Sequence, residues 1–187
     1  MKADEMPTDL QILLESVRGQ LDRQMFEEAW HDLQLVPHNA RDQWLVLAYS
    51  FWAANWLDYT EPAKELALKL MKAEPESGHW HLCYGDLVMK THGPEEAMPW
   101  YVEALRLSPD SQAIHVAMID CLLALGQVEE ARQFLLETIE RFPKQRYYAS
   151  TRPEHRKLLL EADKKDVRGF ASPKPCRECN RAIYGEV

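Results

Sequence analysis

Two cysteines near the end of the chain carry the sharpest chemical signal in the sequence. The segment Cys176-Arg177-Glu178-Cys179 has the Cys-x-x-Cys spacing that can supply two thiolate ligands to zinc. A structural zinc site needs four ligands, and no second pair of this spacing exists, because the other cysteines are Cys83 and Cys121. The βαβ pattern that accompanies redox motifs of this kind is also missing. We therefore expect no cofactor. Zinc at Cys176 and Cys179, completed by a histidine or by a second chain, is the alternative.

The seven histidines do not form a catalytic or metal-binding pattern. The sequence has no His-Glu-x-x-His motif and no phosphate-binding glycine loop, and no nucleophile or paired carboxylate accompanies a histidine. The interval between His81 and His115 recurs elsewhere in the chain, which indicates equivalent positions in a repeat better than it indicates a ligand pair. We therefore expect no catalytic residue and no enzymatic activity.

The interval between these two histidines recurs along most of the chain. It separates four alanines and three prolines: Ala29, Ala63, Ala97 and Ala131, and Pro75, Pro109 and Pro143. Residues four and seven positions after each alanine lie with it on one helical face, where a small side chain lets a second helix approach closely. Each proline follows that helix, where its missing N–H costs little. A constant interval of this kind indicates stacked copies of one unit.

Each unit is expected to contain two helices. In the unit 78–111, His92-Gly93 interrupts an apolar stripe, and Pro94 then suits the start of a second helix. The other clear units are 44–77, which lacks a glycine between its helices, and 112–145. A degenerate unit, 10–43, lacks the closing proline.

These features give the chain a resemblance to tetratricopeptide repeat (TPR) proteins over residues 10–145, carried best by Tyr84-Gly85, Ala97, Tyr101 and Pro109. The resemblance implies an all-α fold, an α-α superhelix that forms a right-handed solenoid of three to four helix pairs. With 187 residues we expect a single domain.

The segments outside the repeats have different expected roles. Thr151-Arg152-Pro153-Glu154 matches a capping box, which predicts a helix from Arg152 to Lys165, within a capping segment 146–165. Residues 1–9 are expected to be a flexible N-terminus and residues 166–187 a basic flexible tail with the two cysteines.

The resemblance also implies that the first helix of each unit lines a concave apolar groove. Trp52 and Trp56 are one helical turn apart, and aromatic anchors of this kind often dominate binding energy. An alternative is that both pack against a neighbouring helix or the N-terminal segment. The predicted partner-binding residues are Tyr49, Trp52, Trp56, His79, Leu82, Cys83, Asp86, Met89, Val116 and Asp120.

The charge distribution limits the expected partners. The formal net charge is −8, but residues 1–143 carry 11 basic and 24 acidic residues, whereas residues 144–187 carry 11 basic and 6 acidic residues. An acidic repeat array is a poor nucleic-acid binder. The sequence shows no signal peptide and no membrane span, and with four cysteines this favours a cytoplasmic location.

The most direct hypothesis is therefore a protein–protein interaction module, a scaffold, adaptor or cytosolic chaperone that binds a peptide or helix in the groove. One alternative is a zinc- or redox-responsive regulator that uses Cys176 and Cys179. Another is a self-associating assembly protein, for which a homo-oligomer is expected.

Overall fold

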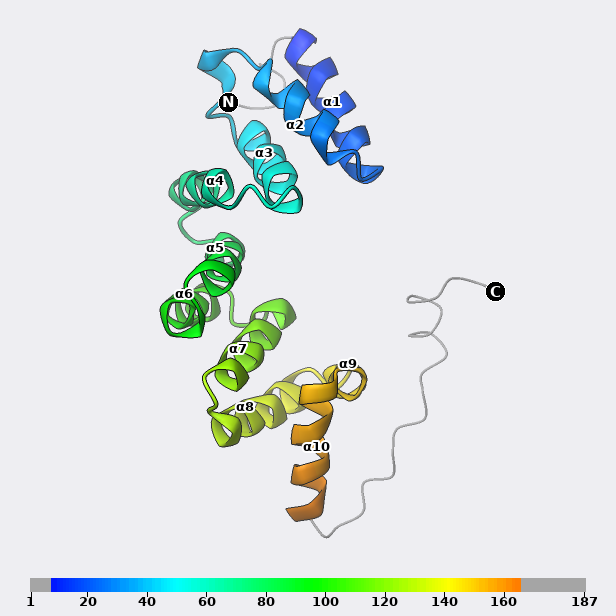
Figure 1. Ribbon diagram of the computed structural model, residues 1–187, viewed down its shortest axis with the longest axis vertical. Coiled ribbons are helices and arrows are strands. Elements are labelled where there is room, and N and C mark those ends of the chain that lie inside the picture. Colours follow the sequence, from blue (N-terminus) through cyan, green and yellow to red (C-terminus); the bar gives the residue numbers. More distant parts are fainter. Residues whose placement is uncertain (1–7, 166–187) are drawn as a thin grey trace, which may run out of the picture. The chain divides into compact units, whose positions relative to one another are not determined.

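The computed structural model describes residues 8–165, which are helical almost throughout (Figure 1). The chain divides into two compact units, unit 1 up to Pro109 and unit 2 from Asp110 onward. The expected all-α fold is confirmed over the described range.

Unit 1 contains six α-helices and a short 3-10 helix in its described part. They are α1 (Thr8–Asp22), α2 (Phe26–Gln34), η2 (His38–Ala40), α3 (Trp44–Trp56), α4 (Thr60–Ala73), α5 (Gly78–Thr91) and α6 (Pro94–Leu107). Figure 1 shows α3 and α5 on one side of this unit and α4 and α6 on the other. The predicted boundaries between repeats at residues 44 and 78 coincide with the starts of α3 and α5.

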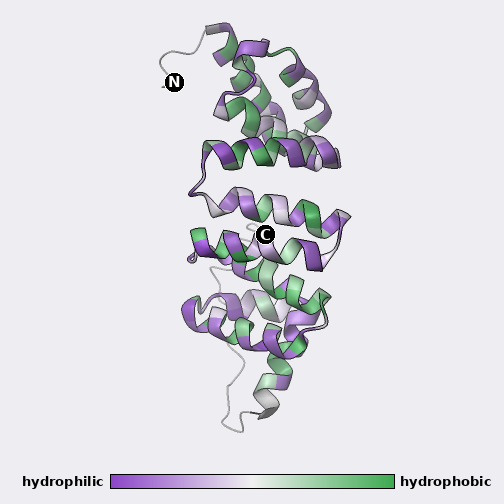
Figure 2. Cartoon of the chain, turned by 90° about the vertical axis from the view of Figure 1, so that its left-hand side faces the viewer, coloured by the Kyte–Doolittle hydropathy of each residue, from purple (hydrophilic) through white to green (hydrophobic). Residues whose placement is uncertain are grey.

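Unit 2 contains four α-helices between residues 110 and 165. They are α7 (Gln112–Ala124), α8 (Val128–Arg141), α9 (Gln145–Thr151) and α10 (Pro153–Lys165). Hydrophilic and hydrophobic residues are mixed along the helices (Figure 2), and α8 and α10 are amphipathic, whereas α7 is apolar over most of its surface. Burial of one face against a neighbour is what stabilises short helices of this kind.

The turn between the two helices of each pair repeats at the level of single hydrogen bonds. An N–H group donates to the carbonyl five residues earlier at the equivalent position of every repeat. The bonds are Met25 to Gln20, Tyr59 to Ala54, Gly93 to Val88 and Gln127 to Leu122. In the three turns where the residue before the donor is left-handed, this is the six-to-one bond of a Schellman motif, which ends a helix and satisfies one of its last carbonyls.

The missing glycine of the unit 44–77 has a structural replacement. Asp58 adopts the left-handed conformation with φ 58°, and Gln24 does so with φ 62°, at the position where Gly126 has φ 74°. In the unit 78–111 the left-handed residue is Gly93, one position later, because α5 continues to Thr91. The turn therefore tolerates a side chain at some cost in backbone energy.

The four alanines of the period are fully buried, as expected for close helix approach. Between α5 and α6 the contact is closer still. A Cβ atom at Gly85 would lie 2.8 Å from Cε1 of Tyr101, and one at Gly78 would lie 2.4 Å from the carbonyl oxygen of Ala104. Side chains at these positions would push the two helices apart.

The segment after the repeats differs in detail from the prediction. The Thr151 hydroxyl donates to the carbonyl of Tyr148 at 2.7 Å and lies at the end of the short helix α9. Arg152 is extended, and its carbonyl accepts the first helical hydrogen bond of α10 from the N–H of Arg156 at 2.8 Å. The predicted capping box at Thr151 is therefore wrong, although a helix does begin at Pro153. Residues 166–187, with Cys176 and Cys179, lie outside the described residues.

The helix α10 packs on the last helix pair. Leu158 and Leu159 are buried in one cluster with Ile119, Ala131 and Leu135. This contact covers apolar surface of α7 and α8, which is the role expected of a capping helix.

Candidate binding surfaces

The side chain of the predicted anchor Trp52 extends from α3 toward α5, the first helix of the next repeat. Its half-buried ring lies 5.2 Å from the ring of Phe51 and 5.9 Å from the ring of His79, which belongs to the first turn of α5. The His79 ring also lies 4.7 Å from that of Trp80. Burial beside these rings lowers the pKa of His79, although the negative charge of Glu74 opposes the change. Trp52 and His79 thus form a mainly uncharged aromatic surface at neutral pH.

Two other predicted residues of α5 have little surface to offer a partner. Leu82 and Cys83 are each only 8% exposed. The Sγ atom of Cys83 lies 3.7 Å from Nε2 of His79, and burial, aided by the charge of Asp86, raises the pKa of the thiol to about 12. Cys83 is therefore a protonated core residue with low nucleophilic reactivity.

The remaining predicted residues of unit 1 keep some exposure. Asp86 is exposed and accepts a hydrogen bond from the hydroxyl of Tyr101 at 2.8 Å, while Met89 is half-buried. Tyr49 is half-buried and packs against the cluster formed by α1, α2 and α3. Together with Trp52 and His79, the residues Asp86 and Met89 define what we call the α3–α5 face.

Trp56 contacts a different part of unit 1 from Trp52. Its ring stacks on Phe26 of α2, with centroids 5.1 Å apart and planes inclined by 5°. The side chain nevertheless remains 64% exposed. Trp52 is therefore in contact with α5 and Trp56 with α2, although the two are one turn apart. Packing against the N-terminal helices describes Trp56 only in part, because most of its surface faces solvent.

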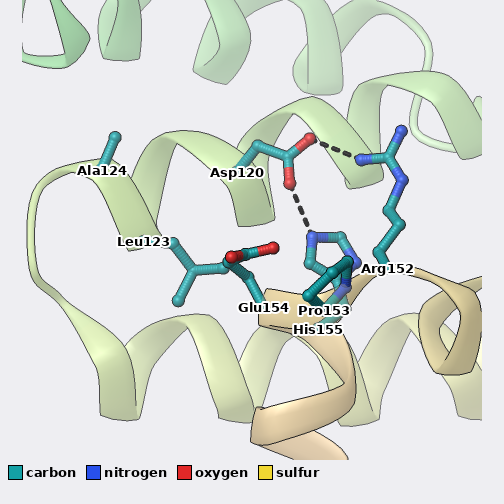
Figure 3. A pocket seen from close by; sticks show the side chains of 7 residues that line it. All are labelled: Asp120, Leu123, Ala124, Arg152, Pro153, Glu154 and His155. Atoms are coloured by element: carbon teal, nitrogen blue, oxygen red, sulfur yellow. Dashed lines mark hydrogen bonds and ion pairs between the residues drawn. The ribbon is translucent and has the colours of Figure 1, made fainter.

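In unit 2, the predicted residue Asp120 contacts the start of α10. Its carboxylate lies 2.7 Å from Nη1 of Arg152 and 2.6 Å from Nε2 of His155 (Figure 3). His155 is only 2% exposed. Burial raises the pKa of Asp120, but the hydrogen bond and charge of His155, with the charge of Arg152, outweigh burial and lower it. Val116, the other predicted residue of unit 2, is half-buried in α7.

A pocket of about 450 Å³ opens beside this ion-pair cluster. It is lined by Asp120, Leu123, Ala124, Arg152, Pro153, Glu154 and His155 (Figure 3). Sequence reasoning placed Asp120 in a binding groove but missed both of its partners. They are 32 and 35 residues away, beyond any local pattern.

The histidines at equivalent repeat positions have equivalent structural roles. Nδ1 of His81 lies 3.2 Å from the carbonyl oxygen of Ser77, and Nδ1 of His115 lies 2.9 Å from that of Ser111. Each ring also contacts an aromatic ring of the second helix in the same repeat. Between residues 8 and 165, no group of three His, Cys, Asp or Glu side chains is arranged to hold a metal ion.

None of the helices in the described range is long and apolar enough to cross a membrane. The predicted zinc ligands Cys176 and Cys179 are outside that range, so zinc binding there stays a prediction.

Comparisons with known proteins agree with the repeat pattern. Residues 89–152 match the sequence model of the tetratricopeptide repeat. MamA from Desulfovibrio magneticus RS-1 has a similar structure, with a TM-score of 0.68 at 16% identity over 85% of this chain and 94% of that one. TTC0263, a TPR protein of Thermus thermophilus, has a TM-score of 0.65 at 20% identity over 84% of each chain. No curated protein sequence matches the chain.

A third solved structure is that of YrrB, described as a TPR protein with an unusual peptide-binding site. Its TM-score is 0.60 at 16% identity, over 81% of this chain and 84% of that one. The resemblance to TPR proteins is thus confirmed, and the fold is an all-α fold of the α-α superhelix class.

Proposed function

We propose that the chain is a non-enzymatic module that binds a protein or peptide partner, and that the α3–α5 face makes the contact. TPR folds position helices so that neighbouring first helices offer a joint surface. The description of YrrB as peptide-binding supports this class of function for a chain of similar fold. A role as scaffold, adaptor or chaperone in the cytoplasm is part of the proposal.

One observation carries the assignment of the face. The half-buried Trp52 ring lies 5.9 Å from the ring of His79, so two neighbouring repeats contribute to a single aromatic surface. Aromatic side chains offer large contact area with few rotatable bonds, which favours binding. Lys90 and Asp58 form an ion pair that adds a polar border between the same two repeats.

The test is quantitative capture of partners from a native lysate with full-length protein. The variant His79→Asp places a charge on the α3–α5 face, so we expect captured partners to fall by about tenfold or more, as for burial of an unpaired charge at an interface. The matched control is Val102→Asp, since Val102 of α6 is 53% exposed and outside the α3–α5 face. Equal capture by both variants would count against the proposed face.

A second function is kept only as a prediction for the tail. A zinc-responsive role requires metal at Cys176 and Cys179, and zinc analysis of the purified full-length protein checks it directly. The other two cysteines, Cys83 and Cys121, are buried in α5 and α7.

A further inference from the structure

Four aromatic residues pair off at one edge of unit 1. The rings of Phe26 and Trp56 are stacked at 5.1 Å, and those of Trp30 and Tyr59 meet edge to face at 5.6 Å. Phe26 and Trp30 come from α2, Trp56 ends α3, and Tyr59 immediately precedes α4. We call these four residues the edge aromatic cluster.

Repeat packing does not require aromatic residues at these positions. The residues one repeat period further along the chain occupy the corresponding positions between the next two repeats. The four equivalent residues there are Thr60, Lys64, Lys90 and Gly93. None of them is aromatic, yet the turn hydrogen bonds of the two units are the same. The aromatic cluster is therefore an addition to the common architecture and needs its own explanation.

The cluster leaves a rigid aromatic surface in contact with solvent. Trp56 is 64% exposed and Tyr59 is 43% exposed. Stacking on Phe26 holds one face of the Trp56 ring, so the ring is already oriented before any partner arrives. A preoriented aromatic surface loses little conformational entropy on binding.

Acidic residues surround the cluster in the sequence. The two stretches that carry Phe26 and Trp56, residues 22–28 and 56–62, contain five acidic residues and one basic residue. Two of the acids are engaged, Asp58 with Lys90 and Glu61 with Lys64. The other three, Asp22, Glu27 and Glu28, are exposed. The local field therefore favours a cationic group over an anionic one.

We propose that the edge aromatic cluster binds a basic segment of the partner, with a lysine or arginine side chain over the exposed face of Trp56. An indole ring is the best aromatic acceptor for such a cation, and the acids nearby add long-range attraction. This inference rests on the proposed function, because it names the chemistry of part of the partner. It adds a contact that the α3–α5 face alone does not define.

The probe for the test is the blocked pentapeptide acetyl-Gly-Arg-Gly-Lys-Gly-amide, titrated into full-length protein. Nuclear magnetic resonance follows the indole N–H signals, and the signal absent from Trp56→Phe identifies Trp56. We expect the Trp56 signal to shift saturably in the wild type. Calorimetric titration of the same peptide should show that Trp56→Leu binds about two- to fivefold more weakly than the wild type, the range for an exposed cation–π contact. The affinity of the conservative variant Trp56→Phe should lie between that of the wild type and that of Trp56→Leu.

Two matched controls distinguish a specific contact at Trp56 from nonspecific binding of the peptide. The variant Trp44→Leu removes another exposed tryptophan and should leave binding unchanged. A peptide with glutamate in place of both cations should leave the Trp56 signal unmoved. Equal shifts with both peptides, or unchanged affinity in Trp56→Leu, would overturn the inference. If His79→Asp still reduces partner capture, the proposed function survives that failure.

Discussion

Nε2 of His155 lies 2.6 Å from Oδ1 of Asp120, and this contact joins the first helix of the last repeat to α10. Arg152 holds the other carboxylate oxygen at 2.7 Å. The carboxylate therefore ties the capping helix to α7 through two charge-assisted contacts, while Leu158 and Leu159 supply the apolar part of the same interface.

The lowered pKa of Asp120 makes the stability of this interface depend on pH. The folded-state pKa lies below its usual value of 3.8, so the stability contributed by the ionised carboxylate is fully present above that value and is lost as the pH falls through the folded pKa. We expect Asp120→Asn to lower the free energy of unfolding at pH 7 by about 1 to 2 kcal/mol, a modest figure for a half-exposed carboxylate.

Thermal unfolding of wild type and Asp120→Asn between pH 7 and pH 3 checks this. The difference between the two proteins should shrink toward acid, because the wild-type carboxylate becomes protonated. A difference that stays constant over the whole range would show that Asp120 acts only through packing.

The contact between Gly85 and Tyr101 predicts a second effect. A valine at residue 85 would place Cβ 2.8 Å from the buried Tyr101 ring, so Gly85→Val should destabilise the protein by about 2 to 3 kcal/mol. Gly19→Ala is the matched control, because an added Cβ there meets nothing within 4 Å and the residue is inside α1. This control should be neutral or stabilising by up to about 1 kcal/mol. Urea denaturation measures both changes, and equal effects would contradict the packing argument.

The left-handed turn residues predict changes of opposite sign. Gln24 has φ 62° at the position that glycine occupies in the last repeat, so Gln24→Gly should stabilise by up to about 1 kcal/mol. Gly126→Ala should destabilise by about 1 kcal/mol, because φ is 74° there. Calorimetry that shows the same sign for both variants would exclude backbone strain as the cause.

The histidine at residue 115 is expected to be structural. Its counterpart in the unit 44–77 is Leu47, which is also buried, so the position accepts an apolar side chain. His115→Leu should change the free energy of unfolding by no more than about 1 kcal/mol, mainly through the lost hydrogen bond to Ser111. A chelator should leave the melting temperature of both proteins unchanged. A chelator-dependent shift in wild type alone would instead indicate metal binding at this histidine.

Features that repeat were predictable because each copy supports the next. The period placed the starts of α3, α5 and α7 at residues 44, 78 and 112, where the structure has them. It also identified Ala29 and its three counterparts as sites of close helix contact. A constant repeat period predicts such features, because every repeat packs against its neighbours in the same way.

Features that occur once were harder to predict. The Thr151 motif looked like a helix start, but its hydroxyl is used at the end of α9. The stacking of Trp56 on Phe26 and the pairing of Asp120 with His155 join residues 30 and 35 positions apart. Only the tertiary structure brings such pairs together.

Hydrogen–deuterium exchange on the full-length protein with its captured partner tests the central claim most directly. We predict slower exchange in peptides that cover Tyr49–Trp56 and His79–Met89, the segments of the α3–α5 face, and no change in the peptide around Val102. Protection confined to α4 and α6, with none in these two segments, would contradict the account.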